Sequence, residues 1–351
     1  MRYAESAIKG TDTEGESESS SQESITPVHT WRRIDAITVL AASPNGKYYC
    51  YGTESGRARL FSTARDKTTE LHNSKGFLSI EQAAWSEDGR YMCFADSGKK
   101  VFVTAMNMDA SESENVAQHR FEVSLKTLTD GSIQQLLFQP DLSHLFIATS
   151  ATLCTVSLWS ASVVRSIPAP EHDRKWIAHP QDPALMLGFG QNSVVMLSWD
   201  LDDRGTYRIE RSHEPGTSAP SDQAAMSRTV ERILVTSDKQ HILVQMSRSK
   251  KSKLKEFLYF TTSSLSTSVS VDTQPRRAGE HRHMVVPIPL PEDIASQMGL
   301  ALSFLKRDRL LFLSRNFSIC SWEIPSEARL AQPSQAMNRP THEKKGFSEV
   351  F

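Results

Sequence analysis

The stretch "AASPNGKYYCYGTESGRARLF", residues 41–61, is followed by a near copy, "AWSEDGRYMCFADSGKKVFV", residues 84–103. Ser43, Gly46 and Cys50 of the first stretch are matched in the second at a constant offset of 43 residues. Each copy places a glycine turn between two runs rich in apolar and β-forming residues, and a second "SG" turn before a third run. Tight glycine turns between such runs are typical of antiparallel strands. The chain therefore repeats a unit of three β-strands.

This three-strand unit recurs with decreasing similarity over residues 133–160, 174–200, 229–262 and 300–324. A period of about 40–45 residues is the length of one four-stranded blade of a β-propeller. Shorter β-like runs can supply the fourth strands; they are "VHTWRRI", "KTTELHNS", "HRFEVSLKTL", "SVVRSIP", "TYRIERSH" and "HRHMVVPI". We therefore predict an all-β propeller with six readable four-stranded blades.

The bulk composition favours an intracellular protein. The 351 residues include 40 basic and 41 acidic side chains, so global charge does not direct the chain to nucleic acid or to an anionic membrane. The four cysteines lie in apolar runs without a CxxC pair, which favours buried thiols over disulfides or a zinc site. No apolar run reaches the ~18 residues of a membrane span, and the N-terminus lacks the apolar core of a signal peptide. We expect a cytoplasmic or nuclear location and no membrane partner.

Composition divides the chain into three parts. Residues 1–27 are acidic and serine-rich, and a segment with so few apolar side chains is expected to be disordered. Residues 28–324 carry the repeats and are expected to form the propeller. Residues 325–351 are too polar for a further three-strand unit, so we expect a disordered C-terminal tail.

The repeats resemble those of WD-repeat proteins. The turns "SPNG", "SEDG", "ESG" and "DSG" match the family pattern, as do Trp159, Trp199 and Trp322 near the ends of third strands. The stretches "LLFQPDLSHLFIAT" and "RKWIAHPQDPALMLGFG" are similar to the divergent C-terminal repeats of large fungal NACHT/WD-repeat proteins. The resemblance covers about residues 30–324. It implies a propeller that binds proteins, as a sensor or regulatory domain of a larger signalling protein.

The resemblance gives five residues a structural role in the blades: Gly46, Gly89, Trp159, Trp199 and Trp322. The hydrogen-bond set typical of the family does not carry over, because no Gly-His pair precedes the inner strands. Seven blades are the commonest number in this family. Either six blades close with "VHTWRRI" beside the last unit, or a seventh blade is missing and the ring is incomplete; we favour the incomplete ring.

The fifth unit carries the predicted partner-binding site. Its long loops, residues 214–227 and 248–255, lie in links that leave a blade from the same end. The second loop contains five basic residues: Arg248, Lys250, Lys251, Lys253 and Lys255. We expect protein partners on this face. An alternative is a nucleic-acid or phosphate binder, but the loop lacks aromatic side chains that stack on bases, so we expect no nucleic acid. A solvated hairpin tip is the simplest interpretation.

No motif in the sequence points to catalysis, a cofactor or a metal. The chain has no G-x-S-x-G, H-E-x-x-H or G-x-x-x-x-G-K-[ST] motif. His281 and His283 have no neighbouring carboxylate or cysteine and make a poor metal site. A propeller hydrolase, a second alternative, needs acids and histidines that converge on the central channel, whereas the inner strands carry Ala, Leu, Ser, Gln and Phe. We therefore expect a non-enzymatic interaction scaffold.

Overall fold

The structure is a computed structural model. It describes residues 35–74, 76–107, 116–125, 131–170, 174–209, 228–247, 255–265, 282–285, 287, 290, 294, 297–305, 309–323 and 348–349. Regular structure in these residues is almost entirely β-strand, which confirms the predicted all-β class. A 3₁₀ helix, η2 (Thr262–Leu265), follows the nineteenth strand. The described strands form six sheets.

Each of the first three sheets has four antiparallel strands in sequence order. The first sheet contains β1 (Ile37–Ala42), β2 (Tyr48–Thr53), β3 (Arg57–Ser62) and β4 (Lys67–Asn73). The second contains β5 (Ile80–Trp85), β6 (Tyr91–Asp96), β7 (Lys100–Met106) and β8 (Ala117–Ser124). The third contains β9 (Ile133–Phe138), β10 (His144–Thr149), β11 (Thr152–Ser157) and β12 (Ser162–Pro168).

The last three sheets differ in strand number. The fourth contains β13 (Lys175–Ala178), β14 (Leu185–Phe189), β15 (Ser193–Ser198), β16 (Asp203–Ile209) and β20 (Arg282–Val285). The fifth contains β17 (Thr229–Val235), β18 (His241–Ser247) and β19 (Lys255–Thr261). The sixth contains β21 (Met298–Leu305), β22 (Arg309–Ser314), β23 (Ile319–Glu323) and β24 (Ser348–Glu349).

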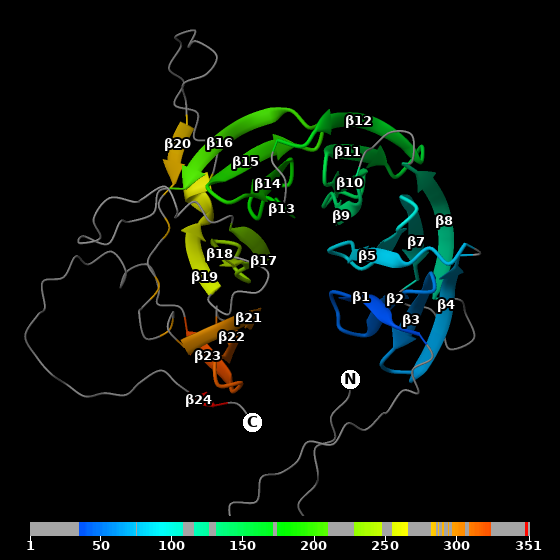
Figure 1. Cartoon of the computed structure of the whole chain (residues 1–351), viewed down its shortest axis with the longest axis horizontal. Helices are drawn as coiled ribbons and strands as arrows, with labels where there is room; N and C mark the ends of the chain where they lie inside the picture. Colours follow the sequence, from blue (N-terminus) through cyan, green and yellow to red (C-terminus); the bar gives the residue numbers. More distant parts are fainter. Residues whose placement is uncertain are drawn as a thin grey trace, which may run out of the picture.

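The six sheets follow one another around a common centre, with the first strand of each sheet innermost (Figure 1). Each inner strand contacts the inner strand of the next sheet, from β1 and β5 through to β17 and β21. The apolar core is correspondingly divided into layers. Five buried clusters occupy the five spaces between successive sheets. Both faces of the four middle sheets are therefore buried, as sheet-on-sheet packing requires.

Side chains join the inner strands of neighbouring sheets. Gln135 of β9 donates from Nε2 to the carbonyl of Trp176 in β13 at 2.5 Å, and its Oε1 accepts the Trp176 amide at 2.8 Å. Arg232 of β17 donates to the Ala301 carbonyl of β21 at 2.7 Å, and Gln245 Oε1, from the second strand β18, accepts the Ala301 amide at 3.0 Å. These side chains make hydrogen bonds to backbone amides and carbonyls of the facing inner strand that do not pair within their own sheet.

The turn between the first and second strands is the same in four sheets. At the equivalent position the residue has a positive φ, and its amide donates to the carbonyl three residues earlier. The four residues are Gly46 (67°), Gly89 (74°), Leu142 (62°) and Lys239 (61°). Glycine adopts this conformation at no steric cost, whereas Leu142 and Lys239 adopt it at some cost. The predicted turn roles of Gly46 and Gly89 agree with this geometry.

One predicted fourth strand joins a sheet other than the one it follows in sequence. The segment "HRHMVVPI" comes after the fifth unit, but its residues Arg282–Val285 form β20 and pair in parallel with β16 of the fourth sheet. The fifth sheet has three strands among the described residues. Parallel strands need a long connection, and residues 210–281, which include the fifth sheet, connect β16 to β20. The 3₁₀ helix η2 directly follows β19.

The end of the chain supplies the outermost strand of the sixth sheet. Ser348 and Glu349 of β24 pair with Ser321 and Cys320 of β23. Part of the predicted C-terminal tail is therefore a strand, held by backbone hydrogen bonds that do not require apolar side chains. Residues 28–34, the predicted alternative for this place, lie outside the described residues, as do residues 1–27. The described sheets form an arc whose ends are the first and sixth sheets (Figure 1).

All four cysteines are free and buried, as predicted. Burial raises the pKa of Cys50 to about 12, so this thiol stays protonated and unreactive near neutral pH. No helix in the described part of the chain combines the length and apolarity of a bilayer crossing.

Candidate partner-binding surface

Three tryptophans were predicted to be structural, and they differ in burial. Trp199 and Trp322 are buried, and Trp199 Nε1 donates to the Pro183 carbonyl at 2.9 Å. Trp159 is 80% exposed. The residue directly after β11 is Leu158, which is buried in the position that Trp199 holds after β15. Leu158, and not Trp159, is therefore the residue equivalent to Trp199. Trp159 lies one position later, in the exposed turn between β11 and β12.

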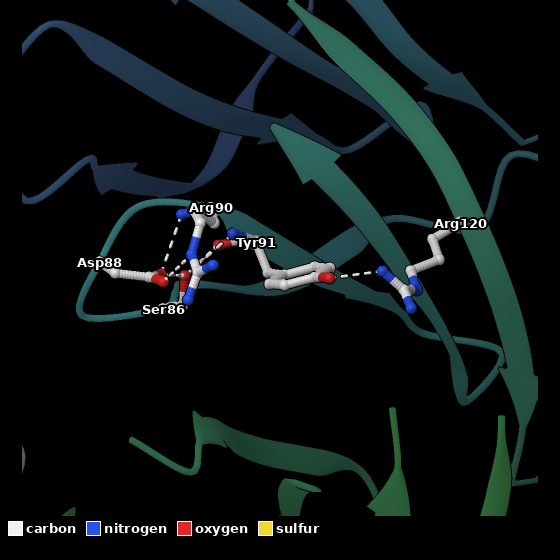
Figure 2. Close-up of polar contacts among 5 residues, drawn as sticks. All are labelled: Ser86, Asp88, Arg90, Tyr91 and Arg120. Carbon is white, nitrogen blue, oxygen red and sulfur yellow. Dashed lines mark hydrogen bonds and ion pairs between the residues drawn. The ribbon is translucent and has the colours of Figure 1, made fainter. Parts of the chain in front are cut away.

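Tyr91, at the start of β6, is held by the turn that precedes it (Figure 2). The Ser86 hydroxyl accepts the Tyr91 amide at 2.9 Å and donates to the Asp88 carboxylate at 2.6 Å. Asp88 also accepts the Arg90 amide at 3.0 Å and forms an ion pair with the Arg90 guanidinium. This network fixes the backbone at Tyr91 and directs its side chain toward β8.

Opposing effects act on the Asp88 carboxyl. Desolvation by burial would raise its pKa, but the hydrogen bonds from Ser86 and Arg90 outweigh it and lower the pKa below the ordinary value. Asp88 is therefore ionised throughout the physiological range. Its charge is compensated by Arg90, so the Asp88–Arg90 pair adds no net charge beside Tyr91.

Arg120 projects from a β-bulge in β8. Val103 pairs with Phe121 and Thr104 pairs with His119, so Arg120 is the extra residue between two ladder positions. A bulge turns its side chain away from the regular alternation of the strand. The Arg120 guanidinium donates to the Tyr91 hydroxyl and lies 5.1 Å from the centre of that ring (Figure 2). It also lies 5.9 Å from the ring of Trp159, which belongs to the third sheet.

We call Tyr91, Arg120 and Trp159 the rim patch. It crosses the boundary between the second and third sheets and presents an aromatic ring and a cation at the surface. Cation–π contacts of this kind are worth about 0.5–1 kcal/mol at exposed positions. Arginine, tyrosine and tryptophan are also the residues most enriched among the energetic centres of protein interfaces. Chemically, the patch offers one cation, two aromatic rings and the Tyr91 hydroxyl for contact with another molecule.

The rim patch was missed by sequence reasoning. Tyr91 and Trp159 were read only as repeat positions, and Arg120 was one charged residue in a predicted outer strand. The three come together through a bulge and a contact between sheets, neither of which leaves a local pattern. The one available signal was Trp159 itself, because a better alignment places Leu158 in the core and Trp159 outside it.

The predicted basic loop is described only at its end. Arg248, Lys250, Lys251 and Lys253 lie outside the described residues. Lys255 begins β19, and its ammonium group forms an ion pair with Glu231 of β17. For Glu231, desolvation would raise the pKa, but hydrogen bonds from Lys255 and Gln245 outweigh it and lower the pKa. Lys255 therefore stabilises the base of the loop.

Both long loops of the fifth sheet leave it from the same end, as predicted from the topology. Thr229 pairs with Ser247, and Ser247 pairs with Lys255, so the three residues that border the loops are neighbours across the sheet. The loops themselves, residues 214–227 and 248–254, lie outside the described residues.

A cleft of about 570 Å³ lies between the outer strands of the first two sheets. Its lining includes Tyr48, Lys67, Leu71 and His119. His119 and Arg120 are consecutive, but only Arg120 belongs to the rim patch. Among the residues that the structure describes, no three His, Cys, Asp or Glu side chains are grouped to hold a metal ion.

Comparisons with known proteins leave the chain without an assigned family. No protein-family model matches it, and no curated protein matches it.

Proposed function

We propose that the chain is a β-propeller of the WD-repeat type whose rim binds other proteins. It acts as a non-enzymatic scaffold, or as a sensor domain of a larger signalling protein. Six successive sheets around one centre, a first turn shared by four of them, and buried tryptophans at the ends of two third strands support the propeller assignment. The assignment to a larger signalling protein rests on the sequence resemblance alone.

The exposed Trp159 beside Arg120 carries the proposal of protein binding. Trp159 contributes little to the core, because Leu158 fills the buried position next to it. Large aromatic side chains with a charged neighbour suit contact surfaces, since they add apolar area at small entropic cost. The rigid layers behind the rim patch keep its three side chains in place before a partner arrives.

Replacement of Trp159 by alanine tests the proposal. We expect Trp159→Ala to keep its circular dichroism and to change the free energy of unfolding by no more than about 0.5 kcal/mol. We expect the same variant to lose partners that the wild-type chain cross-links and captures in its source cells, with affinities at least about tenfold weaker. Quantitative cross-linking mass spectrometry measures this loss.

Phe77→Ala is the matched control, because Phe77 is also 80% exposed but lies in the link between β4 and β5. Unchanged capture by Trp159→Ala would contradict binding at the rim patch. The loops of the fifth sheet are a second proposed contact. Changing Arg248, Lys250, Lys251 and Lys253 together to glutamine tests it in the same assay, with Lys255 left to stabilise the loop base.

A further inference from the structure

Among the residues that the structure describes, Arg120 has no counterion. Two carboxylates of the second sheet are already engaged: Asp88, in the turn before Tyr91, pairs with Arg90, and Glu122, on β8 with Arg120, pairs with Lys100 at 2.5 Å. These pairs cancel in charge, and no described carboxylate lies within ion-pair distance of Arg120. One positive charge is therefore left over at the rim patch.

The Arg120 guanidinium is also held in position. Its contacts with the rings of Tyr91 and Trp159 and its hydrogen bond to the Tyr91 hydroxyl restrict its rotation. A guanidinium carries five N–H donors in a fixed plane, and a fork of two of them matches the two oxygens of a carboxylate. Because the side chain is already ordered, less entropy is lost when an anion binds.

We propose that the rim patch binds an acidic peptide segment of a protein partner. A glutamate or aspartate carboxylate pairs with Arg120, and an adjacent apolar side chain of the peptide covers Trp159. This inference rests on the proposed function and names the chemistry of the partner. The ring of Trp159 excludes water from one side of the ion pair, which strengthens it relative to an exposed pair.

The local charges favour a carboxylate over a phosphate. Recognition of phosphorylated peptides typically uses clusters of arginines, and nucleic acids are held by several cationic contacts along the backbone. Among the described residues, the rim patch offers one uncompensated cation. A single planar carboxylate neutralises that charge, whereas a phosphate group carries about −1.5 to −2 and would leave negative charge unpaired.

Peptide binding to the full chain tests the proposal. The probes are short fluorescent peptides in three matched series. Peptides of the first series contain glutamate next to leucine or phenylalanine. The second series has glutamine in place of each glutamate, and the third has phosphoserine in place of each glutamate. We expect the glutamate series to bind best and the glutamine series to bind at least about tenfold more weakly, since one charged hydrogen-bonded contact is lost. Fluorescence anisotropy gives the affinities.

Two variants locate the site. Arg120→Gln should reduce glutamate-peptide binding to the level of the glutamine series, whereas Arg165→Gln, on the outer strand of the next sheet, should leave it unchanged. In a Trp31→Phe background, used because Trp31 lies outside the described residues, peptide binding should also shift tryptophan emission, and adding Trp159→Phe should abolish the shift, because Trp85, Trp176, Trp199 and Trp322 are less exposed.

Several results would overturn the proposal. These are equal binding of the glutamate and glutamine series, preference for phosphoserine, or no binding in any series. If no peptide binds while Trp159→Ala still abolishes partner capture, the rim patch binds proteins by other chemistry and only the acidic-peptide inference fails. If capture is also unaffected by Trp159→Ala, the proposed binding at the rim patch fails with it.

Discussion

At the residue scale, His179 accepts backbone amides in a turn where other sheets use a serine or threonine hydroxyl, and unlike a hydroxyl it can be protonated. Ser86 and Thr236 begin the first turn in the second and fifth sheets, and their hydroxyls accept backbone amides. In the fourth sheet His179 holds this place, and its Nδ1 accepts the amides of Gln181 at 3.2 Å and Asp182 at 3.0 Å. Burial lowers the pKa of His179, so the neutral ring is the folded form.

This arrangement makes the turn sensitive to acid. Because the folded-state pKa of His179 is depressed, the unfolded chain binds the proton more readily, and stability falls as pH drops below about 6.5. Protonation of Nδ1 also removes both hydrogen bonds. We expect His179→Asn, whose side-chain oxygen can accept the same amides, to lose less stability than wild type between about pH 7.5 and about pH 5.5. Urea unfolding at both pH values measures this, and equal losses would contradict the assignment.

At the scale of elements, the inner strands are linked by side chains in place of a continuous ladder. Gln135 imitates a peptide group, because its amide both donates to and accepts from the backbone of Trp176. The pattern of apolar and polar residues predicted β9 and β13 separately. It did not show that a glutamine in one strand serves the backbone of the other, since the two residues are 41 positions apart.

Replacement of Gln135 by leucine should leave the Trp176 amide and carbonyl unpaired in a largely buried place. An unsatisfied buried polar group costs about 1–3 kcal/mol, so we expect Gln135→Leu to lower the free energy of unfolding by about 2–3 kcal/mol. Gln134→Leu is the control, because Gln134 is the bulged residue of β9 and makes no side-chain hydrogen bond to described residues. Denaturant unfolding compares the two, and equal effects would exclude the bridging role of Gln135.

The position of β20 also belongs to the element scale. Its sequence predicted a strand correctly, but strand propensity carries no information on which open edge the strand will join. The outer edge of β16 accepts it in parallel, after a connection long enough to cross from the fifth sheet to the fourth.

At the scale of the whole molecule, the layers between sheets dominate stability, and contacts across the centre add little. Trp176 is 1% exposed and lies between the third and fourth sheets, with its ring centre 5.3 Å from that of Phe146. Glu87, in the turn after β5, forms an ion pair at 3.1 Å with Lys239, in the turn after β17. These turns belong to sheets on opposite sides of the centre (Figure 1).

The two contacts predict opposite outcomes. Trp176→Ala should lower the free energy of unfolding by about 3–5 kcal/mol, because a large cavity opens between two sheets. Glu87→Gln should change it by less than about 1 kcal/mol, because both partners of this pair are more than half exposed to solvent. Thermal and urea unfolding measure both values. A large effect of Glu87→Gln would mean that the pair across the centre holds the sheets together.

The sequence by itself determined the all-β class, the repeated three-strand unit, the first turn and the burial of the cysteines. These features depend on residues within one repeat, where alternation, glycine and apolar content act over a few positions. The tertiary structure alone decided which edge β20 joins, that β24 extends the sixth sheet, and that Tyr91, Arg120 and Trp159 meet. Those outcomes depend on which strand edges are open and how neighbouring sheets face each other. They are set by packing between segments far apart in the chain, which no local pattern encodes.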